Sequence, residues 1–197
     1  DEIHVLTRSA ARARHFQQQG LCPWVGDVTC PETLPQLPAV DTLLWSVGFD
    51  RDTGHAIQAV YVDGLRHFLG RLPNKVGRII YISSTGVYGQ TDGTWVDEAT
   101  ECRPQRAGGR VCLAAEQLLL QSEWANRTVI LRLAGLYGPQ RLPRLKQLRS
   151  GQPLEAAPEG LLNLIHVEDA AQVVQRVADR TLQLPRVFLV ADGRPVW

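Results

Sequence analysis

The sequence has no methionine, no Cys-x-x-Cys pair and no apolar run that approaches the length of a membrane span. A spanning helix needs about 18 apolar residues, and the N-terminus lacks a signal-peptide pattern, so we expect a cytoplasmic protein. The cysteines lie at ordinary core and loop positions, Cys22, Cys30, Cys102 and Cys112. We therefore expect reduced thiols rather than disulfides, and no metal site.

Neither sign of charge dominates the chain, because it contains 21 basic and 20 acidic residues and no long run of either kind. This balance gives no indication of a nucleic-acid partner or an anionic membrane. We expect a small-molecule substrate or a nucleotide as the partner. A length of 197 residues suits one α/β domain with a small appendage and a substantial core.

Short apolar runs alternate with helical patterns along the chain. Strands are expected at residues 3–6, 21–25, 41–47, 79–82, 127–133 and 186–190, with an extended piece at 161–167 and a turn at 134–139. Helices are expected at residues 10–19, 55–72, 108–124, 142–150 and 168–179. This rhythm predicts an α/β fold in which a doubly wound parallel sheet carries helices on both faces.

The run from Ile79 to Ile82 is too continuous in apolar residues for a half-solvated strand, so we interpret it as a central strand buried on both faces. It ends at Ser83, Ser84 and Thr85. Open α/β sheets bind ligands at the carboxyl ends of their strands, which makes these hydroxyls candidates for chemistry. The alternative is that the serines only cap the following turn.

Three segments together are similar to the extended short-chain dehydrogenase/reductase superfamily, in its NAD-dependent epimerase/dehydratase branch and the atypical members. They are residues 79–89 (IIYISSTGVYG), 130–139 (ILRLAGLYGP) and 163–170 (NLIHVEDA). The resemblance implies a Rossmann-like NAD(P)-binding core at 1–140. It also implies a partial substrate-cap region at 141–197, which includes the last core helix and strand. Ser84 would hydrogen-bond the reacting oxygen of the substrate.

The sequence departs from this family at the first strand. A dinucleotide site needs a glycine-rich turn between the first strand and the first helix, and no such turn occurs here. Residues 3–9 resemble the second strand of the family, so the first βα unit is expected to be absent from this chain. Either the chain is a fragment or the protein has lost its cofactor loop, and both would impair cofactor binding.

A second departure concerns the Tyr and Lys that the family places one turn apart on a helix. Gly108 and Cys112 take their positions, and neither offers an acid or a cation. Another acid or base is then needed for hydride chemistry. The candidates are Tyr88, Tyr137, Glu98 and His166, and no spacing singles one of them out. For Glu98 and His166 a structural role is the alternative.

The resemblance also implies a set of binding residues. Arg8 and Ser9 follow the strand where an Arg accommodates the 2′-phosphate of NADP, so we expect NADP rather than NAD. Other cofactor-side candidates are Asp27, Val28, Ser46, Val47, Ser83, Gly135 and Leu136, and the substrate-side candidates are Arg141, Asn163 and His166. Arg8 as a solvated side chain, Asp27 as a turn residue and Asp169 as a helix cap remain alternatives.

The first hypothesis is therefore an atypical reductase or epimerase/dehydratase that holds NADP and a sugar-nucleotide-like or other small polar substrate. The second is a catalytically inactive NADP-binding sensor or regulatory protein on the same fold, which Gly108 and Cys112 favour. The resemblance also implies a possible homodimer, which would pair through the helices at 55–72 and 108–124.

Overall fold

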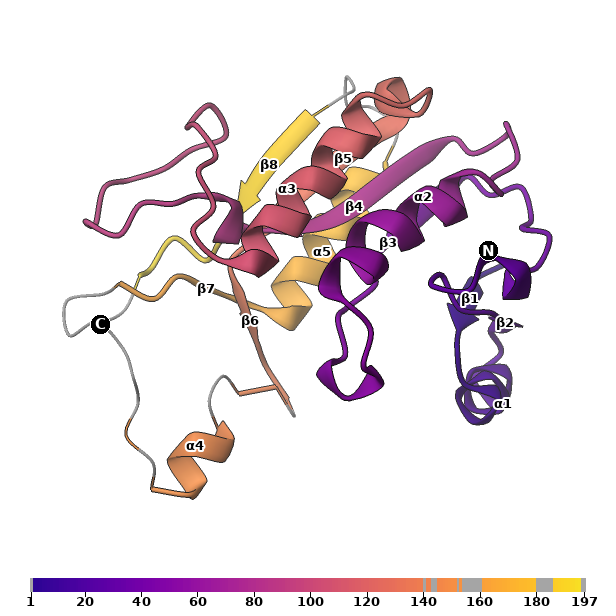
Figure 1. The fold of residues 1–197 in the computed structure, drawn as a ribbon, viewed down its shortest axis with the longest axis horizontal. Helices are drawn as coiled ribbons and strands as arrows, with labels where there is room; N and C mark the ends of the chain where they lie inside the picture. Colours follow the sequence, from indigo (N-terminus) through magenta and orange to yellow (C-terminus); the bar gives the residue numbers. More distant parts are fainter. Residues whose placement is uncertain are drawn as a thin grey trace. The chain divides into compact units, whose positions relative to one another are not determined.

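The structure is a computed structural model that describes residues 2–139, 141–142, 145–151, 153, 161–179 and 186–195 (Figure 1). Strands alternate with helices, and all paired strands in these ranges are parallel, as predicted. The chain forms two compact units. The first unit is Asp1–Asp41 with Val47–Gly77, and the second is Thr42–Ser46 with Arg78–Trp197.

The first unit begins with the predicted strand, helix and strand. They are β1 (His4–Thr7), α1 (Ala10–Gln18) and β2 (Cys22–Val25), and His4 lies opposite Cys22 in the parallel pair. The Ser9 hydroxyl accepts a hydrogen bond from the Arg12 N–H at 3.2 Å and so caps α1. Gly20 follows the helix at a φ of 79°, a left-handed conformation that favours glycine.

The predicted helix at 55–72 is shorter than expected. Asp50 caps a separate 3-10 turn, Arg51–Thr53, and Gly54 ends that turn in a left-handed conformation. The helix then contains a π-helical segment, Ala59–Asp63, and continues as α2 (Gly64–Leu69). A Cβ at Gly64 would lie 2.7 Å from Val28 Cγ2, so the glycine allows this helix to approach Val28 closely.

The second unit is built on a four-stranded sheet in the order β3-β4-β5-β8. Its strands are β3 (Thr42–Trp45), β4 (Arg78–Ser84), β5 (Thr128–Leu133) and β8 (Arg186–Val190). The central strands are buried on both faces, as the apolar run predicts, and Ile79 and Ile80 have no exposed surface.

Two helices cover opposite faces of this sheet (Figure 1). Ile80 and Leu131 pack in one apolar cluster with Ala170 and other residues of α5 (Val167–Ala178). Arg132, the next residue along β5, contacts the opposite helix, α3 (Ala107–Leu120). Neighbouring residues of a strand point to opposite faces, so Leu131 faces α5 and Arg132 faces α3. The sheet therefore lies between two helices, as the predicted Rossmann-like fold requires.

A small two-stranded sheet, β6 (Gly135–Tyr137) and β7 (Leu164–His166), also belongs to the second unit. The prediction of a turn at 134–139 is therefore wrong for its middle. Gly135 N–H donates to the Asn163 carbonyl at 3.0 Å, so the segment finds its partner in a distant part of the chain. The predicted helix at 142–150 appears as α4 (Leu145–Arg149), and residues 143–144 lie outside the described residues.

The ends of α3 and α5 have identifiable contacts. The Ser122 hydroxyl donates to the Leu119 carbonyl at 2.7 Å, and α3 ends before the predicted 124. The predicted α5 begins with His166, rather than Asp169, as its cap. At the other end, Nη1 of the buried Arg78 donates to the Val177 and Asp179 carbonyls. A cation there compensates the negative end of the helix dipole.

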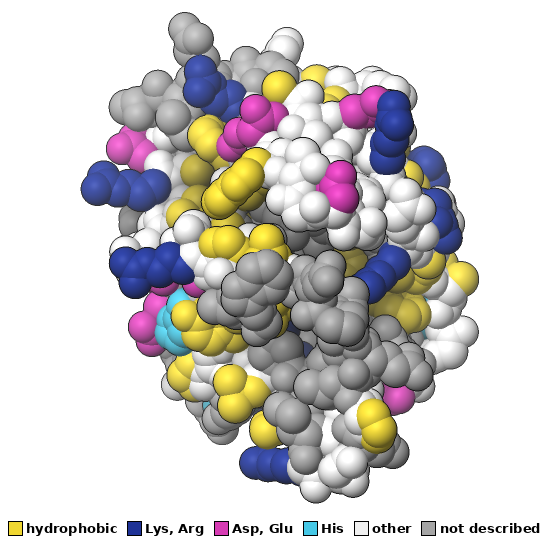
Figure 2. All heavy atoms as spheres, turned by 90° about the vertical axis from the view of Figure 1, so that its left-hand side faces the viewer, with side chains coloured by type: hydrophobic (Ala, Val, Ile, Leu, Met, Phe, Trp, Pro, Cys, Tyr) yellow, Lys and Arg dark blue, Asp and Glu magenta, His cyan; other side chains and the backbone are white. Residues whose placement is uncertain are grey.

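Charges of both signs are interspersed among the described side chains of the face in Figure 2. Within the described ranges, no helix has the length and hydrophobicity to cross a membrane.

The boundary at residue 140 between cofactor core and substrate cap falls inside the second unit and stays a prediction.

Candidate active site and nucleotide-binding residues

The two serines at the end of β4 face opposite sides of the sheet. The Ser84 hydroxyl accepts a hydrogen bond from the Gly86 N–H at 3.1 Å, so the capping role considered for it is present. Ser83 is buried, and its hydroxyl donates to Glu116 Oε1 at 2.5 Å beneath α3. Capping uses a lone pair of Ser84 and leaves its hydroxyl proton for another acceptor. Its role toward a substrate stays a prediction.

A buried ion pair joins α3 to β5. The Arg132 Nη2 lies 2.7 Å from Glu116 Oε2, its Nε contacts both carboxylate oxygens, and the two residues are 6% and 1% exposed. The sequence reasoning missed both residues. A charged residue inside the apolar strand pattern TVILRL was the available signal, because buried charges need partners.

Tyr88 completes this buried network. Arg132 Nη1 donates to its hydroxyl at 2.9 Å, and that hydroxyl donates to the Asp97 carbonyl at 2.8 Å. Burial raises the pKa of Tyr88, although the hydrogen bond from Arg132 acts in the opposite direction. A phenol that is bonded on both sides and has a raised pKa is poorly suited to proton exchange near neutral pH. These contacts favour a structural role for Tyr88 over the acid/base role considered for it.

Gly108 and Cys112, which take the positions of the family's Tyr and Lys on α3, have different surroundings. A Cβ at Gly108 would have no heavy atom within 4 Å, so the position is open. Cys112 is buried, and burial followed by the nearby Glu116 charge raises its pKa to about 11, while a hydrogen bond with Tyr81 acts the other way. Cys112 is therefore a neutral thiol at physiological pH and supplies no cation.

This environment predicts slow alkylation of Cys112. At pH 8 the rise from 9.0 to about 11 reduces the reactive thiolate roughly 100-fold relative to an ordinary cysteine, and burial slows access further. We expect Cys112 to react with iodoacetamide at least about 100-fold more slowly in the native protein than in urea, as followed by peptide mass spectrometry. Equal rates in the two conditions would contradict the burial of this thiol.

The other acid/base candidates fall in two places. Glu98 Oε1 accepts a hydrogen bond from the Leu189 N–H of β8 at 2.8 Å, which ties its loop to the sheet. Tyr137 and His166 lie opposite each other in β6 and β7, with ring centroids 5.2 Å apart. His166 Nδ1 also accepts from the Glu168 N–H at 3.4 Å and caps α5. Of these candidates, Tyr137 and His166 form a contacting pair.

The substrate-side candidates gather around the same small sheet. Arg141 Nε donates to the Leu136 carbonyl at 3.3 Å, and the backbones of Arg141 and Gly138 exchange two hydrogen bonds of 3.0 and 3.1 Å. Asn163 binds Gly135 through its carbonyl. The side chains of Arg141 and Asn163 are exposed, so a polar ligand has access to them.

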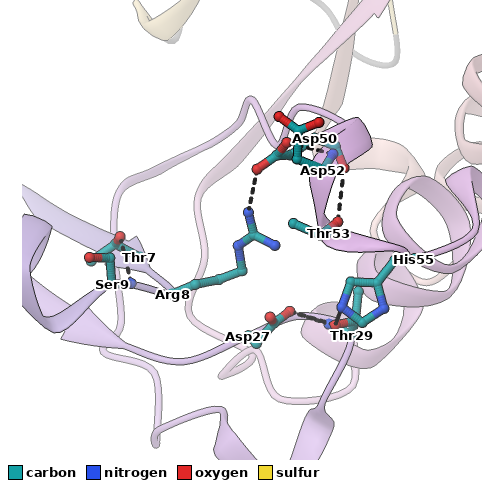
Figure 3. Close-up of polar contacts among 9 residues, drawn as sticks. All are labelled: Thr7, Arg8, Ser9, Asp27, Thr29, Asp50, Asp52, Thr53 and His55. Carbon is teal, nitrogen blue, oxygen red and sulfur yellow. Dashed lines mark hydrogen bonds and ion pairs between the residues drawn. The ribbon is translucent and has the colours of Figure 1, made fainter.

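The cofactor-side candidates of the first unit lie at the carboxyl ends of β1 and β2. Figure 3 shows Thr7, Arg8, Ser9, Asp27, Thr29, Asp50, Asp52, Thr53 and His55. Arg8 Nη2 lies 3.4 Å from Asp50 Oδ2, and Asp27 Oδ1 accepts from the Thr29 N–H at 2.8 Å and its hydroxyl at 2.7 Å. The sequence reasoning missed Asp50 and His55, which come from the segment after β3.

Asp27 is held in its ionised form. Burial acts to raise its pKa, but the hydrogen bonds from Thr29 and the charges of Arg8 and His55 outweigh it, and the pKa is lowered. An ionised carboxylate at this position can accept hydrogen bonds from an amine or a sugar hydroxyl. Val28 beside it is buried, and its carbonyl accepts a hydrogen bond from His67 Nδ1 at 3.0 Å.

These residues fit the adenosine end of a nicotinamide dinucleotide, because they offer an ionised acid and a guanidinium at adjacent strand ends. The connection from β1 to α1, Thr7-Arg8-Ser9, contains no glycine, and Ser9 already caps the helix. It provides no cradle for the pyrophosphate. Ser46 is exposed at the end of β3 in the second unit, and Val47 is half-buried at the start of the next segment.

Glu2, His4 and Cys22 form a cluster with possible metal ligands within 4.8 Å of one another. The Trp24 indole N–H donates to His4 Nδ1 at 3.1 Å, so the proton of the neutral imidazole lies on Nε2, the atom that faces Glu2. Cys22 in turn donates to Glu2 at 3.2 Å, and this bond raises its pKa. In this structure the three side chains contact one another, and the expected absence of a metal site stays a prediction.

Comparisons with known proteins agree with this architecture. The chain is 41% identical over 100 residues to Protein YeeZ of Escherichia coli K12, a match that spans 50% of this chain and 34% of that protein. The structure of a conserved protein of unknown function from Silicibacter pomeroyi is 31% identical with a TM-score of 0.74, and the match covers 99% of this chain and 65% of that one. These matches leave much of each relative's length uncovered.

A third likeness shows the fold alone. DesIV, a dTDP-glucose 4,6-dehydratase of Streptomyces venezuelae solved with NAD and DAU bound, is 18% identical with a TM-score of 0.80, over 100% of this chain and 68% of that one. The decisive match is to a family model, that of the NAD dependent epimerase/dehydratase family, over residues 57–191. Because this match spans more than half of the 197 residues, the chain belongs to the NAD-dependent epimerase/dehydratase family.

Proposed function

We propose that this chain binds NAD(P) and contributes to an epimerase/dehydratase-like or reductase-like reaction of the atypical short-chain type. The observation that supports nucleotide binding best is the ionised Asp27 beside the Arg8 guanidinium, at the carboxyl ends of two adjacent parallel strands. Parallel sheets bind nucleotides at this edge. Asp27 would hold the adenosine, and Arg8 would hold the phosphate on its ribose.

Arg8 is also the reason to propose NADP as the preferred cofactor. An acidic residue after this strand would hydrogen-bond the ribose hydroxyls of NAD, whereas a guanidinium pairs with the 2′-phosphate of NADP. The Arg8 side chain is about half exposed, so a phosphate can reach it. No glycine-rich turn connects β1 to α1, so the residues proposed here hold the adenosine end of the cofactor and not its pyrophosphate.

The proposed substrate is a sugar nucleotide or another small polar molecule. Arg141 and Asn163 are exposed next to β6 and β7. The guanidinium of Arg141 suits a phosphate, and the amide of Asn163 suits hydroxyl groups. Tyr137 and His166 contact each other there and would supply proton transfer in place of the family's Tyr and Lys. Ser84 would polarise the reacting oxygen. Self-association through α2 and α3 is part of the proposal.

A second function, that of an inactive NADP-binding sensor, is favoured by one observation. Gly108 presents no side chain, and Cys112 is a buried neutral thiol, so the helix face that carries the catalytic pair in the family has no titrating group near neutral pH. A protein of this kind would respond to nucleotide occupancy and would leave sugar nucleotides unchanged.

Titration with NADPH and NADH tests the proposal. We expect quenching of tryptophan emission with energy transfer to the reduced nicotinamide, and tighter binding of NADPH than of NADH. In the presence of bound NADPH, a panel of UDP- and dTDP-sugars separates enzyme from sensor. Turnover that Ser84→Ala abolishes without changing NADPH affinity supports the enzyme, and binding without turnover supports the sensor. Absence of binding at millimolar NADPH and NADH contradicts both functions for this chain.

A further inference from the structure

Asp50 holds its carboxylate in a fixed position beside Arg8 (Figure 3). Its Oδ1 accepts a hydrogen bond from the Asp52 N–H at 3.1 Å, and its backbone carbonyl accepts one from the Thr53 hydroxyl at 2.8 Å. The second carboxylate oxygen, Oδ2, lies 3.4 Å from Arg8 Nη2. One oxygen thus anchors the acid to its own turn, and the other faces the guanidinium.

We propose that Asp50 sets the preference between the two nicotinamide cofactors by competing with the 2′-phosphate of NADP for Arg8. This inference rests on the proposed nucleotide binding. Asp50 engages one edge of the guanidinium at Nη2 and places a negative charge beside it, so a 2′-phosphate must share Arg8 with this carboxylate or displace it. The ribose of NAD carries a hydroxyl at that position, so NAD binds with the Arg8–Asp50 pair intact.

The strength of this competition follows from exposure and charge. The side chains of Arg8 and Asp50 are 46% and 50% exposed, and exposed ion pairs are weak, so a phosphate can displace the carboxylate. Arg8 also acts on Asp27, whose pKa its charge helps to lower. One guanidinium therefore serves two carboxylates before a phosphate arrives. Asp50 reduces the advantage of NADP by a moderate factor and does not abolish binding.

The test compares two fragments of the cofactor that differ only by the 2′-phosphate, adenosine 2′,5′-bisphosphate and AMP, by isothermal titration at constant ionic strength. In Asp50→Asn the amide oxygen still accepts the Asp52 N–H, so the turn is kept while the charge is lost. We expect about fivefold tighter binding of the bisphosphate and less than about twofold change for AMP. Asp50→Ser, which also caps the turn without a charge, is a second variant with the same expected result.

Asp52→Asn is the matched control, because it changes the net charge equally two residues away and its carboxylate has no described contact with Arg8. We expect less than about twofold change for either ligand. Arg8→Gln completes a double-mutant cycle, in which the gain from Asp50→Asn should disappear.

A gain that persists without Arg8, an equal gain for AMP, or no gain in either Asp50 variant would overturn the role of Asp50 while nucleotide binding stands. If the unaltered chain and all variants bind neither the bisphosphate, AMP nor the intact cofactors, the proposed function falls together with this inference.

Discussion

Replacing Glu116 with alanine is expected to lower the free energy of unfolding by about 3–5 kcal/mol, because it leaves the guanidinium of Arg132 buried without its partner. Arg132 is 6% exposed, and its contacts with Glu116 and Tyr88 keep it charged against the effect of burial. The same substitution removes the acceptor of the buried Ser83 hydroxyl. Urea unfolding followed by circular dichroism measures the loss.

The control for this experiment is Glu101→Ala. Glu101 pairs with Arg103 at 2.6 Å, a distance as short as that of the buried pair, but both side chains are about 70% exposed. Solvent already screens this contact, so we expect little change in stability. Similar losses in the two variants would mean that Glu116 and Arg132 are more solvated than the structure indicates.

The second large effect is expected at Gly109, where α3 meets the turn that follows β4. A Cβ on Gly109 would overlap the backbone carbonyl oxygen of Gly86 and lie 2.9 Å from Pro104 Cβ. The oxygen belongs to the main chain, so the helix or the turn must move. We expect Gly109→Ala to destabilise the protein by about 1–3 kcal/mol, as overpacking does elsewhere.

Gly108 provides the matched comparison, one residue earlier in the same helix. A Cβ there meets nothing within 4 Å, and alanine is the better helix former. We expect Gly108→Ala to stabilise the protein by about 0.5–1 kcal/mol. The two alanine variants should therefore shift the thermal midpoint in opposite directions. A Gly109→Ala variant as stable as Gly108→Ala would show that α3 does not approach Gly86 as closely as described.

The parallel fold could be predicted because its signals are local. The continuous run from Ile79 to Ile82 is enough to identify a strand that is buried on both faces. The β6 strand was missed because Gly135 to Tyr137 becomes a strand only by pairing with residues 164–166, far along the chain. Local patterns do not contain this information.

In the candidate site too, some features could be predicted from local sequence and others could not. Ser84, Arg8 and Asp27 follow predicted strands directly, and their positions at strand ends were predictable from order alone. Partners were not. Glu116 meets Arg132 across two different elements, and Asp50 reaches Arg8 from a segment 42 residues away. Such pairs are determined by tertiary packing, which a single sequence leaves open.

The alternation along β5 also has a consequence for strand registration. Arg132 contacts Glu116 on one face of the sheet, and Leu131 and Leu133 pack with α5 on the other. A slip of β5 by one residue would exchange these faces. It would place the guanidinium of Arg132 in the apolar layer against α5 and leave the carboxylate of Glu116 without a counter-ion. The Glu116–Arg132 pair therefore penalises misaligned pairing of β5. Because Ser83 lies opposite Arg132 and donates to the same Glu116, this carboxylate also keeps Ser83, rather than Ser84, on the α3 side of the sheet.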